Sequence, residues 1–219
     1  MTTPRDRPFS RSVCVALVLI AFGLQADAAE PADGVRVALE TTAGAIEVEV
    51  FPERAPLSAC DFLAYVDGGL YERAAFYRVV RTDNDRGTPR IEVVQGGLQD
   101  EAKARPPIAH ETTQMTGLTH VDGALSLARG PVGTGSAAAF FIVIGSQPAL
   151  DFGGARNADK QGFAVFGRVV RGMDVVRRIH RMRSDAPTGD AYTTGQLLNE
   201  PVAITKATRL GAPSSRCRS

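Results

Sequence analysis

The stretch Val35-Arg36-Val37-Ala38-Leu39-Glu40-Thr41-Thr42-Ala43-Gly44-Ala45-Ile46-Glu47-Val48-Glu49-Val50 decides the fold class of this chain. Apolar and polar side chains alternate on both sides of residues 41–44. A period of two residues is typical of a β-strand with one face in the core and the other in water. The segment therefore predicts a β-hairpin with one solvated face, which belongs to a larger sheet.

Further strand-like runs follow the hairpin, and two segments have helical spacing instead. The first helical segment opens at Pro56 and stops at Gly68-Gly69, and the second runs from Gly172 to Met182. The fold class predicted is mainly β: a closed antiparallel β-barrel of about eight strands capped by two α-helices, because closure removes exposed sheet edges. The strands expected after the hairpin span residues 75–81, 91–95, 124–128, 139–144, 163–170 and 202–208.

The N-terminus has the pattern of a secretory signal peptide. Three arginines precede an apolar run at residues 13–24, which is followed by Ala26-Asp27-Ala28. A membrane span needs about 20 apolar residues, so we expect cleavage near Ala28 and a periplasmic or secreted protein. It would then meet the membrane only transiently, and an uncleaved N-terminal membrane anchor is the alternative. We expect a signal peptide at 1–28, one domain at 35–210 and a disordered tail at 211–219.

Charge and cysteine content exclude some classes of partner. The chain has 25 basic and 24 acidic residues, and loss of residues 1–28 would remove three arginines and two aspartates. The balance that remains gives no reason to expect nucleic acid as a partner. Cys60 lies in the first predicted helix and Cys217 in the tail. An oxidising compartment would permit a bridge between them, but a small buried hydrophobic residue is the more common role for a cysteine like Cys60.

Two long polar side chains, Arg78 and Gln95, stand in otherwise apolar strands. Such a pair in a barrel usually faces a ligand rather than the core. They belong to a series of blocks that resembles the cyclophilin-type peptidyl-prolyl cis-trans isomerases, specifically a bacterial exported member. The blocks are Ala55-Pro56 with Phe62, Phe76-Tyr77-Arg78, Gln95-Gly96-Gly97, residues 123–129, Phe140-Phe141-Ile142, Leu150-Asp151, residues 163–169 and residues 172–176.

The resemblance implies acceleration of X-Pro isomerisation without a cofactor, a metal or a covalent intermediate. It also implies two catalytic residues: Arg78 as donor to the prolyl nitrogen, and Gln95, which would hold the guanidinium or the substrate backbone. Proline-containing polypeptides would be the substrates, and a monomer is expected. The residues that would bind substrate are Val93, Ala128, Arg129, Ala139, Phe141, Leu150 and Phe163. Phe140 points away from Phe141 along its strand and is expected in the core.

Several positions depart from the family pattern. Ala139 replaces a common glutamine, Ala149 a frequent aromatic residue and Phe163 a histidine or tyrosine. Glu92 falls where a phenylalanine is expected, and Ile91 or Val93 would fill that slot. These changes predict activity that is reduced or shifted in sequence preference. A proline-peptide-binding chaperone with weak or no turnover is the alternative.

Other site chemistries have little support. His110, His120 and His180 lack metal-ligand spacing, and each is expected on the surface or in a loop. Ser126 and Ser136 have no histidine within a recognisable nucleophile motif. The sequence therefore predicts neither a metal centre nor a serine hydrolase.

Overall fold

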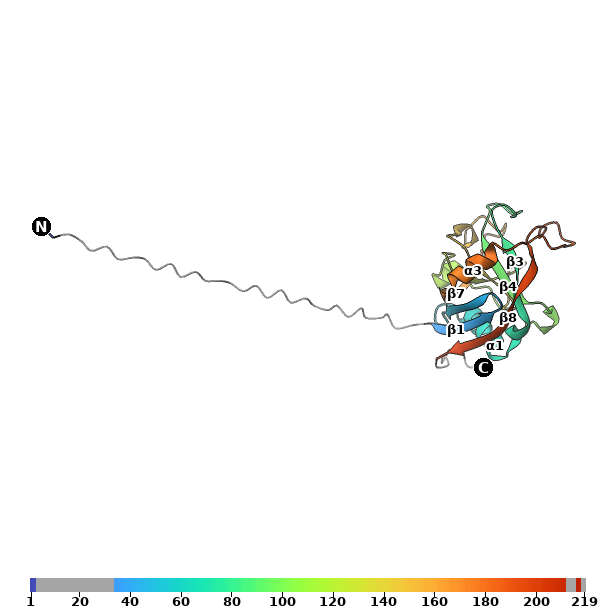
Figure 1. The fold of residues 1–219 in the computed structure, drawn as a ribbon, viewed down its shortest axis with the longest axis horizontal. Helices are drawn as coiled ribbons and strands as arrows, with labels where there is room; N and C mark the ends of the chain where they lie inside the picture. Colours follow the sequence, from blue (N-terminus) through green and yellow to red (C-terminus); the bar gives the residue numbers. More distant parts are fainter. Residues whose placement is uncertain (3–33, 212–215, 218–219) are drawn as a thin grey trace. The chain divides into compact units, whose positions relative to one another are not determined.

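The computed structural model describes residues 1–2, 34–211 and 216–217, and the described part forms a closed antiparallel β-barrel (Figure 1). The strands follow one another around the barrel in the order β1-β2-β7-β5-β6-β4-β3-β8. This confirms the predicted closed eight-stranded barrel. Their bounds are β1 Val35–Thr41, β2 Gly44–Val50, β3 Ala74–Val80, β4 Val93–Leu98, β5 Ala124–Leu127, β6 Ala139–Val143, β7 Ala164–Arg171 and β8 Leu197–Leu210.

The β1–β2 hairpin forms as its alternation predicts. Val37 pairs with Val48 and Leu39 with Ile46, and all four side chains are fully buried. Gly44 closes the turn with φ 128°, a conformation that an L-residue rarely adopts. The pleat thus turns the apolar side of the hairpin to the barrel interior and leaves the polar residues on the outside.

The two predicted helices are α1 (Pro56–Asp67) and α3 (Met173–His180). A third, α2 (Thr113–Thr116), was not predicted because it is a single turn, capped by the Thr112 side chain, which accepts a hydrogen bond from the Met115 amide. Three short 3-10 helices complete the described helical segments: η1 Leu70–Arg73, η2 Glu101–Lys103 and η3 Pro148–Leu150.

Helix α1 fills the barrel from one side with aromatic side chains. Pro56 occupies its first turn, where a missing N–H costs nothing, and the next two free amides, of Leu57 and Ser58, donate to the buried carboxylate of Glu111. Phe62 of α1 then packs edge-on against Phe140, with ring centroids 5.6 Å apart. Phe140 is fully buried, as predicted. Replacing such a ring by alanine costs about 3–5 kcal/mol of stability.

Strand β3 has an irregularity that bears on the site. Its pairing with β4 aligns Phe76 with Gly96 and Arg78 with Gln95, so Tyr77 is an extra residue. A β-bulge of this kind bends the strand and redirects the side chain that follows it. On its other edge β3 pairs with β8, which begins at Leu197 opposite Arg78, five residues earlier than predicted. Because Leu197 pairs with Arg78, the residues just before β8 lie close to Arg78.

The expectation for Cys60 is wrong. Cys60 and Cys217 form a disulfide, because Cys60 lies on a partly exposed face of α1 that Cys217 reaches, not in the core. In the described part of the tail, Arg216 also pairs with Glu53. The expectation of a disordered tail at residues 211–219 stays a prediction. Residues 212–215 and 218–219, and residues 3–28 of the expected signal peptide, lie outside the described residues.

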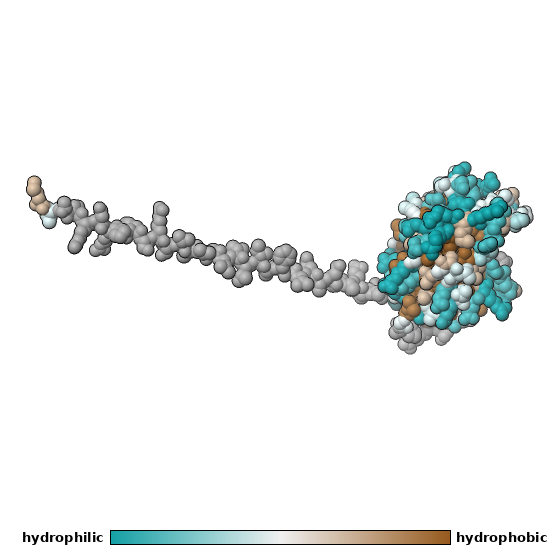
Figure 2. Space-filling model, in the orientation of Figure 1, coloured by the Kyte–Doolittle hydropathy of each residue, from teal (hydrophilic) through white to brown (hydrophobic). Residues whose placement is uncertain are grey.

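One face of the barrel is largely polar (Figure 2). Figure 2 shows hydrophilic side chains around a smaller hydrophobic area on the face that carries β1, β8 and α3 in Figure 1. Within residues 1–2, 34–211 and 216–217, no helix has the length and apolar character that a membrane crossing requires.

Candidate active site

Strands β3 and β4 place Arg78 and Gln95 side by side. Arg78 Nη1 donates to Gln95 Oε1 at 2.9 Å, and Gln95 Nε2 donates to the Tyr77 hydroxyl at 3.1 Å. The contact follows from the bulge, since the strand register makes Arg78 and Gln95 direct neighbours. The guanidinium is partly buried, and this burial lowers the pKa of Arg78 from its ordinary value. Arginine nonetheless stays charged at neutral pH.

The pair lies in a groove of about 660 Å³. The residues that the sequence nominated for substrate binding come from β4, the segment after β5, β6, η3 and the segment before β7, and the structure brings all of them into this groove. Ile91 and Val93, which were expected to fill the position of the family phenylalanine, both line the groove, and Glu92 does not. The nominated residues in its wall are Arg78, Val93, Gln95, Ala128, Arg129, Ala139, Phe141, Leu150 and Phe163.

One end of the groove, which we call the apolar end, is formed by Phe141, Leu150 and Phe163. The rings of Phe141 and Phe163 meet edge to face with centroids 5.4 Å apart. Leu150 is fully buried at the end of η3. Arg129 covers the other side of Phe163 at 5.3 Å, and its own charge is paired with Asp159. These contacts build a rigid apolar slot of the kind that accepts a small ring.

The apolar end rests on a buried polar chain that sequence reasoning missed. His120 Nδ1 lies 2.7 Å from Asp151 Oδ1, and its Nε2 lies 3.0 Å from Ser126 Oγ. The imidazole also stacks on Phe141, with ring centroids 6.0 Å apart. Burial lowers the pKa of His120, and the hydrogen bond to Asp151 opposes this only in part. The imidazole is therefore neutral at pH 7.

Each histidine was expected on the surface or in a loop. His120 lies in the loop between α2 and β5, as expected, although it is buried. The expectation is wrong for His180, which is the last residue of α3 and is buried. His180 binds the Val80 carbonyl through Nε2 at 2.9 Å, and His110 binds the Gln161 carbonyl at 3.1 Å. Ser126 is fully buried and so presents no accessible nucleophile. Among the residues that the structure describes, no cluster of three or more His, Cys, Asp or Glu side chains could hold a metal ion.

Next to the apolar end lies a polar cluster, which we call the polar end. Arg78 and Gln95 line the groove there, and Gln95 is the direct cross-strand partner of Phe141. Gln196 completes the polar end; it is fully buried and contacts Arg78. Gln196 Oε1 accepts from Arg78 Nε at 2.9 Å and from Nη2 at 2.6 Å. The ring of Tyr192 lies under the same guanidinium, with its centroid 5.5 Å from Cζ. Both residues come from the α3–β8 loop, residues 181–196. Sequence reasoning missed them because no motif marks this loop.

Residues 82–90 form part of the connection between β3 and β4, and we call them the 82–90 insertion. This segment is fixed to the groove by an ion pair. Arg156 donates to both carboxylate oxygens of Asp85 at 2.7 and 2.8 Å, and both side chains are almost fully buried. Burial acts to raise the pKa of Asp85, but the hydrogen bonds from Arg156 and from two backbone amides outweigh it, so the pKa is lowered. Arg156 also donates to the Tyr192 hydroxyl at 2.9 Å. The insertion thus supports the loop that carries Tyr192.

Comparison with known proteins agrees with this geometry. The family described as "Cyclophilin type peptidyl-prolyl cis-trans isomerase/CLD" matches residues 36–209. "Peptidyl-prolyl cis-trans isomerase A" of Dickeya dadantii is 32% identical over 152 residues, which cover 68% of this chain and 73% of that protein. "Peptidyl-prolyl cis-trans isomerase" of Acinetobacter baylyi is 31% identical over 171 residues, covering 77% and 81%.

A solved structure shares the fold. The cyclophilin-type isomerase of Cryptosporidium parvum superposes with a TM-score of 0.59 at 20% identity and covers 82% of this chain and 99% of its own. At that identity the likeness concerns the fold, and the sequence matches establish the family. The chain is an isomerase and belongs to the cyclophilin-type peptidyl-prolyl cis-trans isomerases.

Proposed function

We propose that the protein accelerates X-Pro isomerisation in exported or periplasmic polypeptides, without a covalent intermediate or a cofactor. The observation that carries this proposal is the groove itself, in which a charged guanidinium faces an apolar slot. The C. parvum relative has been solved in the presence of the dipeptide Ala-Pro, which supports a proline-containing ligand for this fold.

The reaction needs little chemistry from the protein. Rotation about an X-Pro amide is slow because its C–N bond has partial double-bond character, with a barrier of about 18–20 kcal/mol. In the proposed mechanism Arg78 donates to the prolyl nitrogen and draws its lone pair out of resonance, while Gln95 fixes the guanidinium. Phe141, Leu150 and Phe163 would hold the proline ring so that only one side of the amide rotates.

The proposed reaction needs the whole groove and not Arg78 alone. An acceleration of about a hundred-thousandfold requires about 7 kcal/mol of preferential transition-state stabilisation. One charge-assisted hydrogen bond contributes about 1.5–3 kcal/mol. The remainder must come from water exclusion and from restriction of the peptide, which is the role we assign to the apolar end.

A protease-coupled assay on proline-containing peptides tests the mechanism. We expect Arg78→Ala to lower kcat/KM by about a hundredfold, in line with one lost charge-assisted hydrogen bond and its positioning. Arg171→Ala is the matched control, because this arginine is on β7, is 79% exposed and does not line the groove. An unchanged rate in Arg78→Ala would remove Arg78 from the mechanism.

The second candidate is a proline-peptide-binding chaperone with negligible turnover. Ala139 lines the groove where an amide would reach the peptide main chain, and Ala149 does not reach the groove wall. Ala139→Gln separates the two functions. A large gain in turnover at unchanged peptide affinity would favour the chaperone for the natural chain, whereas a wild-type rate already well above background favours the isomerase.

The cellular setting is a separate part of the proposal. The disulfide between Cys60 and Cys217 supports an oxidising compartment, in agreement with a signal peptide at residues 1–28. Fractionation of the native host and N-terminal sequencing test it: we expect a periplasmic or secreted protein that starts after Ala28 or Ala29. A membrane-bound protein that retains residues 1–28 would establish the anchor instead.

Light scattering of the mature protein would test the expected monomer.

A further inference from the structure

We propose that Gln196, delivered by the α3–β8 loop, is a positioning residue that holds Arg78 in the orientation needed for isomerisation. This inference rests on the catalytic role proposed for Arg78. Gln196 Oε1 accepts two hydrogen bonds from the guanidinium, from Nε and from Nη2, at 2.9 and 2.6 Å. Gln95 holds Nη1 on another side. Together the two amides fix the plane of the guanidinium.

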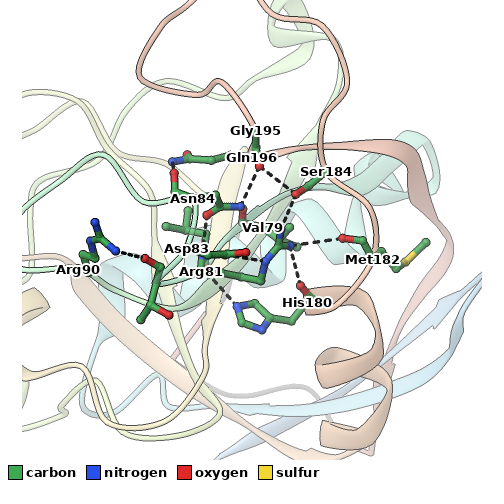
Figure 3. Close-up of polar contacts among 12 residues, drawn as sticks. Val79, Arg81, Asp83, Asn84, Arg90, His180, Met182, Ser184, Gly195 and Gln196 are labelled. Atoms are coloured by element: carbon green, nitrogen blue, oxygen red, sulfur yellow. Dashed lines mark hydrogen bonds and ion pairs between the residues drawn. The ribbon is translucent and has the colours of Figure 1, made fainter.

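Gln196 is itself held by several contacts (Figure 3). Its side chain is fully buried, and Nε2 donates to the Asn84 carbonyl at 2.9 Å. That contact sets the orientation of the amide, because only the NH₂ group can face a carbonyl, and Oε1 must then face Arg78. The Gln196 carbonyl accepts from the Val79 amide at 2.9 Å, which ties the loop to β3 one residue beyond Arg78.

The surrounding network extends this support to the 82–90 insertion. Asn84 Nδ2 donates to the carbonyls of Val79 and Gly195, and Ser184 Oγ also donates to the Gly195 carbonyl. Arg81 binds Ser184 Oγ and the carbonyls of His180 and Met182. Figure 3 shows these side chains converging between β3, the end of α3 and the start of β8. The 82–90 insertion and the α3–β8 loop, neither of which contains a family motif, therefore contact each other at Gln196.

The chemistry of an amide suits this position. A carboxylate at Gln196 would neutralise the cation, whereas a neutral acceptor orients Arg78 and leaves its positive charge for the developing transition state. Arginine also has a long flexible stem, so fixing three of its N–H groups removes rotamers that would miss the substrate. Gln196 thus supplies an amide to the polar end of a groove that has Ala139 in place of the expected glutamine.

The test compares Gln196→Leu with Thr194→Ala, a control that removes a hydrogen bond between a loop side chain and the Asp190 carbonyl without touching Arg78. We expect Gln196→Leu to lower kcat about tenfold with KM changed less than twofold, and Thr194→Ala to retain the wild-type rate. In the Arg78→Ala background, Gln196→Leu should cause no further loss. The ¹⁵Nε–¹H signal of Arg78, protected from exchange in the wild type, should lose that protection.

Two results would overturn the inference while leaving the proposed function intact: an unchanged kcat in Gln196→Leu, or an equal loss in the wild-type and Arg78→Ala backgrounds, which would indicate a general effect on the fold. A wild-type protein without isomerase activity, or one insensitive to Arg78→Ala, would instead overturn the proposed function. If Gln196→Leu unfolds at the assay temperature, Gln196→Met takes its place with the same expectations, since methionine keeps the unbranched shape and lacks a strong acceptor.

Discussion

The two ends of the groove are built in different ways. Phe141 and Phe163 at the apolar end come from two short blocks whose order in the sequence already predicts a shared pocket, and they contact each other directly. Arg78 at the polar end needs partners from the bulged β3, from β4 and from the α3–β8 loop. The apolar end thus depends on packing within the barrel, and the polar end on hydrogen bonds from a segment outside it.

This difference predicts how each end responds to substitution. Packing defects at the apolar end should affect stability and activity together, because the same side chains fill the core and line the groove. Changes to Arg78 or Gln95 should affect activity with little loss of stability, since both side chains are only partly buried and water can replace their hydrogen bonds.

Phe141→Ala should have the largest effect. It removes a ring that contacts both Phe163 and His120, so we expect a loss of about 3–4 kcal/mol in the free energy of unfolding and a drop of at least about a hundredfold in kcat/KM. Urea titration and the coupled assay measure both. Phe152→Ala is the control, because Phe152 is 39% exposed and does not line the groove. Full activity in Phe141→Ala would mean that the proline ring binds elsewhere.

Arg78→Lys comes next and isolates the polar end. Lysine keeps the charge but cannot reproduce the fork that contacts Gln95 and Gln196, so we expect kcat/KM to fall by about thirtyfold while the midpoint of unfolding stays within about 2 °C of the wild type. Arg168→Lys, at a 61% exposed arginine that pairs with Glu49, serves as control. A loss of stability as large as that of Phe141→Ala would abolish the distinction between the two ends.

The barrel could be predicted from the sequence because its strands alternate and their order matches a family. The same holds for the groove residues that lie within motif blocks, such as Arg78 and Leu150. Gln196 and Tyr192 could not be predicted, since β8 begins before its apolar run and the loop ahead of it has no pattern of its own. The His120–Asp151 contact was missed for a related reason: it joins residues 31 positions apart that only the fold brings together.

The pairing of Cys60 with Cys217 is another contact between distant residues that the sequence pattern does not predict. Cys60 recurs with apolar residues along α1, which favoured a core position, but the neighbouring turns cover it only in part. Periodicity predicts which face of a helix is apolar; it does not predict which residue of a distant tail returns to that face. The disulfide spans 157 residues, so no local pattern could have indicated it.

Acid should weaken the apolar end before the polar end. His120 has a pKa below its unfolded value of about 6.5 because it is buried, so between those two values the unfolded chain binds a proton that the folded chain does not. Stability then falls as pH drops below about 6.5, by at most about 1.4 kcal/mol per pH unit for this group. His180, also with a lowered pKa, adds a slope of the same sign.

The contribution of His120 is measured by comparing urea titrations of wild type and His120→Asn between pH 7.5 and about 5. The variant should be less stable at pH 7.5 but should lose less stability on acidification, because only the wild type has this proton to bind. Identical slopes would mean that His120 keeps the same proton affinity after unfolding. Arg78 does not titrate in this range, so peptide contacts at the polar end should persist.

Tyr192→Ala should have the smallest effect. The ring is 45% exposed and lies on the rim of the groove, where it covers the guanidinium of Arg78 and is fixed by the hydrogen bond from Arg156. Removing it leaves the bonds from Gln95 and Gln196 in place, so we expect kcat/KM to change only about threefold on average. The size of the change should depend on the residues that flank proline, because in the proposed mechanism the rim would contact the peptide rather than the rotating bond. A peptide series that varies one flanking residue at a time measures this, and a uniform change across the series would assign Tyr192 to the support of Arg78 alone.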